Sequence, residues 1–155
     1  MLPILGEKEI REDDLYGYAR VPEHLDRIEY GRFRNVYLYI TEKCQLRCAH
    51  CYMGERLESA KFMPLSEVKH NIQLWRKMGG SKLSILGGEP TLHPDFIEIC
   101  RYAKRVGYEK IILNTNGLRK SLQPLSQMDP EEFSYIQVSL DGGSSETHDL
   151  IRGPG

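Results

Sequence analysis

The sequence has no long apolar run, no excess of either charge and few cysteines. None of its hydrophobic stretches approaches the roughly 20 residues that a membrane-spanning helix needs, so we expect no membrane partner. Its first nine residues contain neither a basic segment nor a long apolar one, which argues against a secretory signal peptide. With 21 Lys and Arg against 22 Asp and Glu, the formal charge is −1, too little positive charge to drive sequence-independent binding of nucleic acid.

The length and composition indicate one globular domain. The chain has 155 residues, of which 40% are hydrophobic and 28% charged, enough to bury a core. Residues 1–34 are charged and interrupted by glycine and proline, so we expect an irregular lead-in segment with one short helix. Residues 35–155 are expected to form the domain itself.

Strand and helix patterns alternate through this domain. Residues rich in β-branched and aromatic side chains predict strands over 35–41, 82–86, 110–113 and 135–140. Apolar residues at helical spacing predict helices over 64–78 and 94–106, a weaker one over 119–128 that contains Pro124, and a fourth that begins near Ser144. This order predicts an α/β fold, a partial TIM-like (β/α) barrel of parallel strands, truncated after about four βα units.

The residues that follow each predicted strand are polar or rich in glycine. They are Thr41–Cys44, Gly87–Pro90, Asn114–Gly117 and Asp141–Gly143. Because chemistry in parallel α/β folds gathers just past the carboxyl ends of the strands, we expect one end of the sheet to bind a ligand. A sheet that stopped after the fourth strand would leave an edge exposed. We therefore expect a further segment or a partner chain to complete it, and the chain to be the amino-terminal part of a longer protein.

Three cysteines, Cys44, Cys48 and Cys51, lie within eight residues directly after the first predicted strand. Three closely spaced thiols cannot all pair, so disulfides are a poor interpretation. A structural zinc site would need a fourth ligand, which only His50 or the more distant His93 offers. Three thiolates fit an iron–sulfur cluster better, and they would leave one iron of a [4Fe–4S] cluster open to an exchangeable ligand.

The C-x3-C-x2-C spacing on a loop after the first strand strongly resembles the radical S-adenosylmethionine (radical SAM) superfamily. The segment Gly87–Pro90 after the second strand is similar to the GGE motif of that family, although on its own it is most often a tight turn. The resemblance runs from Asn35 to the end of the chain. It implies that Cys44, Cys48 and Cys51 hold three irons of a [4Fe–4S] cluster, while S-adenosylmethionine chelates the fourth. Reduction would then yield a 5′-deoxyadenosyl radical that takes a hydrogen atom from the substrate.

The resemblance also implies cofactor-binding roles around the glycine turn. Gly87 and Gly88 would let the backbone approach the methionine part of the cofactor, and Glu89, followed by Pro90, would accept a hydrogen bond from its amino group. His50 would pack near the adenine, with a surface histidine as the alternative.

Further cofactor-binding candidates follow the third and fourth strands. Ser139 matches a position that touches the ribose or the carboxylate, with an ordinary strand serine as the alternative. Asn114, Thr115 and Asp141 are pocket candidates that are equally typical of turns. The fourth cysteine, Cys100, falls on the apolar face of a predicted helix and is expected to be a core thiol.

The segment Gln137–Gly142, together with His148-Asp149 and Arg152-Gly153, looks like the peptide- and protein-modifying branch whose members carry SPASM or twitch extensions. The extra cysteines of such an extension are absent from this sequence. The resemblance implies a cytoplasmic enzyme with a peptide or small-molecule substrate and an external electron donor such as a flavodoxin or ferredoxin. Two alternatives remain open, an iron–sulfur or electron-transfer module without radical activity and a zinc-binding interaction domain.

Overall fold

The computed structural model describes residues 34–154, so the predicted lead-in falls outside the described part except for Arg34. The strands are β1 (Asn35–Tyr39), β2 (Lys82–Leu86), β3 (Lys110–Thr115) and β4 (Tyr135–Val138). The α-helices are α2 (Leu65–Lys77), α3 (Phe96–Arg105), α4 (Arg119–Leu122) and α5 (Ser145–Arg152). Short 3-10 turns cover Gly54–Glu58, Pro90–Leu92, Leu125–Gln127 and Pro130–Glu132.

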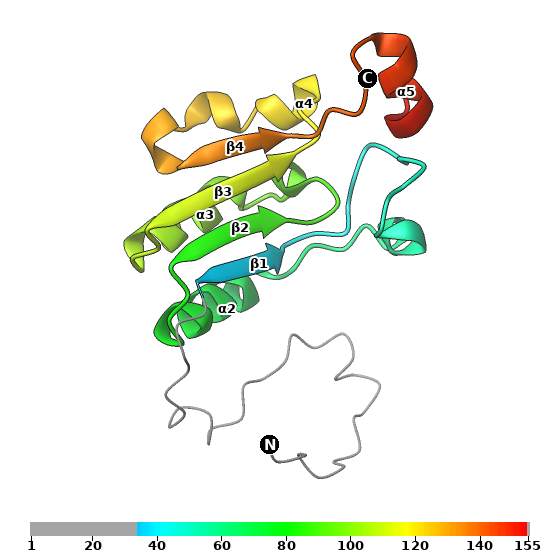
Figure 1. Cartoon of the computed structure of the whole chain (residues 1–155). Coiled ribbons are helices and arrows are strands. Elements are labelled where there is room, and N and C mark those ends of the chain that lie inside the picture. The colour runs from blue at the N-terminus through cyan, green and yellow to red at the C-terminus, as the bar shows by residue number, and fades with distance from the viewer. Residues whose placement is uncertain (1–33, 155) are drawn as a thin grey trace, which may run out of the picture.

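The four strands form one parallel sheet in the order β1-β2-β3-β4 (Figure 1). Their register places Val36 beside Leu83, and Leu83 beside Ile111. Each strand is joined to the next by a helical segment, which confirms the predicted α/β fold class with parallel strands. Because all four strands run the same way, their carboxyl ends gather at one end of the sheet.

The hydrophobic core lies between the sheet and helices α2 and α3. The central strands contribute side chains with no exposed surface, such as Leu83, Ile85 and Leu113. Helix α3 faces them with Phe96 and Cys100, spaced one helical turn apart and almost fully buried. Burying each large apolar side chain contributes roughly 1.5–3 kcal/mol, so this layer stabilises the frame on which the strand ends are mounted. The prediction that Cys100 is a core thiol is confirmed.

Several predicted element boundaries are wrong by a few residues. The first strand ends at Tyr39, because Thr41 instead makes an isolated antiparallel bridge with Phe62. The third strand continues to Thr115 and the fourth ends at Val138. The predicted helix over 119–128 is reduced to the four residues of α4 and a 3-10 turn, because Pro124 has no N–H to continue the helical ladder.

The last helix begins as predicted, but it does not run on to the end of the chain. The Ser144 hydroxyl caps α5 by accepting a hydrogen bond from the Thr147 N–H at 3.4 Å. Helix α5 ends at Arg152, where Gly153 takes a positive φ of 87° that favours glycine.

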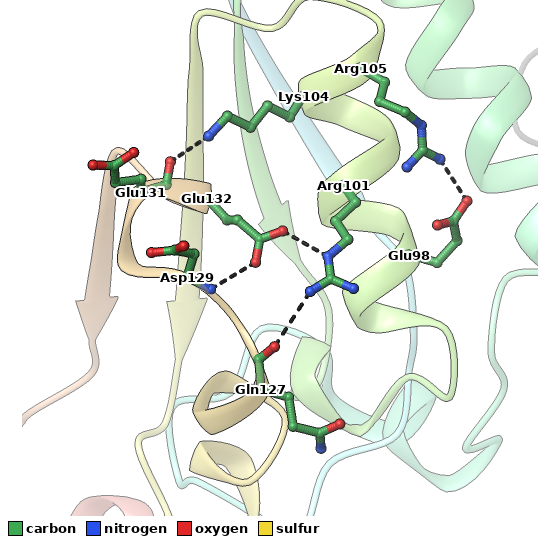
Figure 2. A network of polar contacts seen from close by, with 8 residues as sticks. All are labelled: Glu98, Arg101, Lys104, Arg105, Gln127, Asp129, Glu131 and Glu132. Atoms are coloured by element: carbon green, nitrogen blue, oxygen red, sulfur yellow. Dashed lines mark hydrogen bonds and ion pairs between the residues drawn. The ribbon is translucent and has the colours of Figure 1, made fainter.

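A polar network holds the segment between α4 and β4 against α3 (Figure 2). Arg101 Nε donates to Glu132 Oε1 at 2.8 Å, and the Asp129 N–H donates to Glu132 Oε2 at 2.9 Å. Lys104 Nζ donates to the Glu131 carbonyl oxygen at 2.8 Å. Desolvation opposes ionisation of Glu132. The hydrogen bonds from Arg101 and Asp129, together with the positive charges of Arg101 and Lys104, nevertheless hold the pKa of its carboxyl below the ordinary value.

The other face of the sheet is exposed along β1 but buried at Ser84 and Ile112, and the β4 edge is exposed. Tyr37 and Tyr39 point away from α2 and α3 and are exposed, whereas Val36 and Leu38 between and beside them are buried. All four side chains of β4 are exposed. Among residues 34–154, no helix has the length and apolar character needed to cross a membrane.

Candidate functional site

A cavity of about 250 Å³ lies where the carboxyl ends of the strands meet the cysteine loop, residues 41–53. Figure 1 shows this loop and α5 at the same end of the sheet. Most of the residues predicted from the sequence line this cavity: Cys44, Cys48, His50, Cys51, Gly87, Gly88, Asn114, Thr115 and Ser139. The fold therefore brings together candidates from all four strand ends.

The side chains of Glu89, Pro90 and Asp141 are not part of the cavity lining. Glu89 and Pro90 are buried beneath the glycine turn. Asp141 lies at the margin, where one carboxylate oxygen is 3.6 Å from His50 Nε2 and also forms an ion pair with Arg152 Nε. The cofactor-binding roles expected for these three residues stay predictions.

The cysteine loop is a series of tight turns that present the three thiols to the cavity. The Cys51 N–H donates to the Cys48 carbonyl at 3.0 Å, and the Gly54 N–H donates to the Cys51 carbonyl at 3.1 Å. All three thiols are free and partly exposed.

The three thiols influence one another electrostatically. Burial is the main cause that raises the pKa of the Cys44 thiol, and Glu89, Cys48 and Cys51 raise it further, while the Leu46 N–H lowers it. Three thiolates that line one cavity would repel one another, and a bound cation would relieve that repulsion.

The glycine turn is packed against the start of the cysteine loop. The Gly88 N–H donates to the Thr41 carbonyl and the Glu89 N–H to the Lys43 carbonyl, both at 2.8 Å. A methyl group at Gly87 would lie 2.5 Å from the Thr41 carbonyl oxygen, and one at Gly88 would collide with the Lys43 carbonyl oxygen. Glycine is thus required here by the chain's own backbone, while the same turn also forms part of the cavity wall.

The carboxylate of Glu89 connects this turn to β3. Glu89 has no exposed surface, and its Oε1 accepts hydrogen bonds from Thr91 Oγ1 at 2.6 Å and Thr115 Oγ1 at 2.8 Å. Its Oε2 accepts from the Asn116 N–H at 2.8 Å. A buried carboxylate satisfied in this way fixes the relative position of the second and third strand ends.

Two polar cavity residues, Asn116 and Arg152, were not singled out by the sequence analysis as site residues. Asn116 follows β3 directly, and its place in the polar segment after the strand was the available signal. Arg152 reaches the cavity only because α5 folds back, with its Nη1 4.0 Å from Cys48 Sγ. Apolar side chains complete the wall: Leu46, Tyr52, Met53 and Leu86.

His93 is not available as the fourth ligand of a zinc site. That ring is buried with Nε2 2.8 Å from the Met63 carbonyl oxygen, and its Nδ1 accepts from the Asp95 N–H at 3.0 Å. In the part of the chain that the structure describes, no group of three or more His, Cys, Asp or Glu side chains converges to hold a single ion. Three cysteines that each bind a different iron of a cluster need not converge on one point.

Comparison with known proteins agrees with the family resemblance of the sequence. A model of the Radical SAM superfamily matches residues 38–155. The chain is 30% identical over 137 residues to "Mycofactocin maturase MftC" of Mycobacterium tuberculosis, covering 87% of this chain and 35% of that protein. It is 35% identical over 116 residues to "AdoMet-dependent heme synthase" of Methanosarcina barkeri, covering 74% and 33%. The chain therefore spans about a third of the length of these relatives.

Solved structures support the fold. The crystal structure of Streptococcus suis SuiB bound to precursor peptide SuiA aligns with a TM-score of 0.64 at 22% identity, covering 84% of this chain and 30% of that one. SuiB bound to S-adenosylmethionine aligns with a TM-score of 0.59 at 21% identity, covering 77% and 26%. The sheet and helices described above therefore resemble the partial barrel of SuiB.

Proposed function

Because the chain belongs to the radical SAM superfamily, we propose that its cavity binds a [4Fe–4S] cluster and S-adenosylmethionine side by side. Cys44, Cys48 and Cys51 would hold three irons of the cluster. The observation that carries this proposal is the location of three free, neighbouring thiols in one cavity with the glycine turn. Soft thiolate ligands are typical of iron–sulfur clusters, and the positive irons would offset the repulsion between the thiolates.

The remaining cavity residues offer contacts that match the parts of S-adenosylmethionine. The backbone at Gly87 and Gly88 would lie along the methionine, with Asn114, Thr115 and Ser139 as polar partners. His50 is 54% exposed at the side chain and would provide a flat surface for the adenine. Arg152 is the only Lys or Arg among the lining residues, so we assign it as the partner of the S-adenosylmethionine carboxylate.

The function proposed for the protein is radical chemistry on a substrate. A cluster held by Cys44, Cys48 and Cys51 would supply an electron for the reductive cleavage of S-adenosylmethionine, and so the radical chemistry that removes a hydrogen atom from the substrate. The chain's own contribution is to orient the cofactor with the strand-end residues and to exclude water with the apolar wall. A flavodoxin or ferredoxin would deliver the electron, and the protein would work in the cytoplasm.

A peptide or protein is the substrate class we propose. Support comes from SuiB, which was crystallised with a precursor peptide, and from the resemblance of residues 137–142 to the peptide-modifying branch. The relatives also include the heme synthase of Methanosarcina barkeri and a "GTP 3',8-cyclase" of Vibrio atlanticus, 32% identical over 127 residues. A small-molecule substrate is therefore the outcome to test against.

Anaerobic reconstitution tests the cluster and cofactor part of this proposal. The 155-residue chain, supplied with ferrous iron and sulfide, is expected to gain broad visible absorption and close to four irons and four sulfides per chain. Addition of S-adenosylmethionine and dithionite is expected to release 5′-deoxyadenosine. A colourless protein, or one that retains zinc without sulfide, would overturn the proposal. A stable cluster that never yields 5′-deoxyadenosine would instead support the electron-transfer alternative.

A further inference from the structure

Asn116 joins the end of β3 to the first cysteine of the loop. Its side-chain Nδ2 lies 4.0 Å from Cys44 Sγ, within hydrogen-bonding reach of a sulfur acceptor. The two residues are far apart in sequence and meet only because β1 and β3 end at the same edge of the sheet. The rest of the Asn116 side chain determines whether this contact is incidental or fixed.

Hydrogen bonds to its oxygen fix the orientation of the Asn116 amide. Oδ1 accepts from the Leu118 N–H at 3.0 Å and from Ser121 Oγ at 2.9 Å. A backbone N–H can bond only to an acceptor, so the oxygen must occupy that side of the amide. The NH2 group is therefore directed toward Cys44, and a flipped amide would place two donors against each other.

The network behind Asn116 includes two buried side chains, those of Ser121 and Glu89. Ser121 has no exposed surface, and its hydroxyl also accepts from Gln45 Nε2 at 2.8 Å, which brings the residue next to Cys44 into the same network. The backbone N–H of Asn116 donates to the fully buried Glu89 at 2.8 Å. Asn116 is thus held at its backbone by the turn after β2, and at its side chain by α4 and by the cysteine loop.

We propose that Asn116 is a positioning residue whose side-chain N–H donates to the Cys44 sulfur and raises the reduction potential of the bound cluster. The inference rests on the proposed function, because it concerns the cluster assigned to the cysteine loop. Reduction adds negative charge to the cluster and its sulfur ligands. A fixed N–H donor stabilises that charge, so the reduced form is favoured relative to a site without the donor.

Asn116→Ser is the direct test. The serine hydroxyl is able to accept from the Leu118 N–H and keep the local turn, but it is too short to offer a donor to Cys44. Gln123→Ser is the matched control, because it makes the same amide-to-hydroxyl change on an exposed residue just after α4. The measurement is the midpoint potential of the reconstituted 155-residue chain, followed by electron paramagnetic resonance with viologen mediators.

The expected result is a more negative potential for Asn116→Ser, with iron content and helical circular dichroism unchanged, and no shift for Gln123→Ser. Asn116→Asp keeps the oxygen acceptor, loses the donor and adds a negative charge, so its potential should fall below that of Asn116→Ser. It also serves as the second variant if the serine protein fails to assemble a cluster. An unshifted potential in a loaded Asn116→Ser or Asn116→Asp protein overturns the inference alone. Failure of the unaltered chain to assemble a cluster overturns the proposed function together with it.

Discussion

The Ala49 N–H donates to the Ile151 carbonyl oxygen at 2.7 Å, which joins the middle of the cysteine loop to the last turn of α5. Arg152 follows directly, so this one backbone hydrogen bond places its guanidinium at the cavity beside Cys48. The site therefore includes residues from both the first and the last parts of the described chain. Changes in either part should be felt at the cavity.

Cys48→Ala is expected to abolish the broad visible absorption of the reconstituted protein. Removing one of three thiolates leaves two ligands and a second open iron, which is too few to retain the cluster. Absorbance and iron analysis after anaerobic desalting measure the loss. Retention of both by Cys48→Ala would show that the ligand assignment is wrong.

Cys100→Ala provides the matched control for that experiment. Cys100 is fully buried in α3 within the apolar core. The variant should keep its absorption and lose about 1 kcal/mol of unfolding free energy, because one buried group of roughly methyl size is deleted. Loss of colour in both variants would indicate a general folding defect in place of a specific ligand effect.

Gly88→Ala is expected to displace the cysteine loop. The added methyl group would collide with the Lys43 carbonyl oxygen, next to Cys44, and overpacking of this kind costs roughly 1–3 kcal/mol. The urea concentration at the unfolding midpoint and the iron content should both decrease. Gly143→Ala is the control, since a methyl group there meets nothing within 4 Å. Equal behaviour of the two variants would contradict the close contact between the glycine turn and the loop.

Alkylation should separate the four cysteines in the folded, reduced and metal-free protein. Cys44, Cys48 and Cys51 are partly exposed, whereas Cys100 is buried, and burial strongly raises the pKa of the Cys100 thiol. Because the thiolate is the reactive form, iodoacetamide at neutral pH should modify three cysteines and spare Cys100 until urea is added. Peptide mass spectrometry identifies the sites. Early modification of Cys100 would place it outside the core.

Glu132→Gln should destabilise the protein at neutral pH but not in acid. The pKa of Glu132 is lowered on folding, so its ionised carboxylate stabilises the fold above its unfolded pKa of about 4.3. That contribution is lost as the pH falls through the folded pKa. The free energy of unfolding, measured with urea, should therefore be lower for the variant than for the unaltered chain at pH 7. This difference should disappear toward pH 3. Glu131→Gln is the control, because Glu131 is exposed and contacts Lys104 through its backbone carbonyl, which the substitution keeps. Its free energy of unfolding should equal that of the unaltered chain at both pH values.

The order of elements and most of the cavity could be predicted from local sequence patterns. A strand such as β2 has its own apolar run, and Gly79-Gly80 follow α2 where the helical spacing stops. Parallel topology then places the residues after each strand at one end of the sheet. For this reason Cys44 and Gly87 could be predicted to lie at the site, and the family resemblance added Ser139.

The remaining features depend on contacts between residues distant in sequence. Arg152 reaches the cavity through the return of α5, and the amide of Asn116 is oriented by Ser121 and the Leu118 N–H. Glu89, which was predicted to accept a hydrogen bond from the cofactor's amino group, also accepts hydrogen bonds from Thr115 and Asn116, and only the structure identifies these two partners. Spacing along the chain carries no information about these partners, because each depends on how separate loops pack.

The bonding of Glu89 has a consequence for protein engineering. Its carboxylate belongs to the turn after β2 but accepts hydrogen bonds from the hydroxyls of Thr91 and of Thr115 in β3, and from the Asn116 N–H just after β3. Anyone who transplants the glycine turn into another scaffold must therefore transfer Thr115 and the backbone that follows it as well. A graft of the four turn residues alone would bury the Glu89 carboxylate without these hydrogen-bond donors.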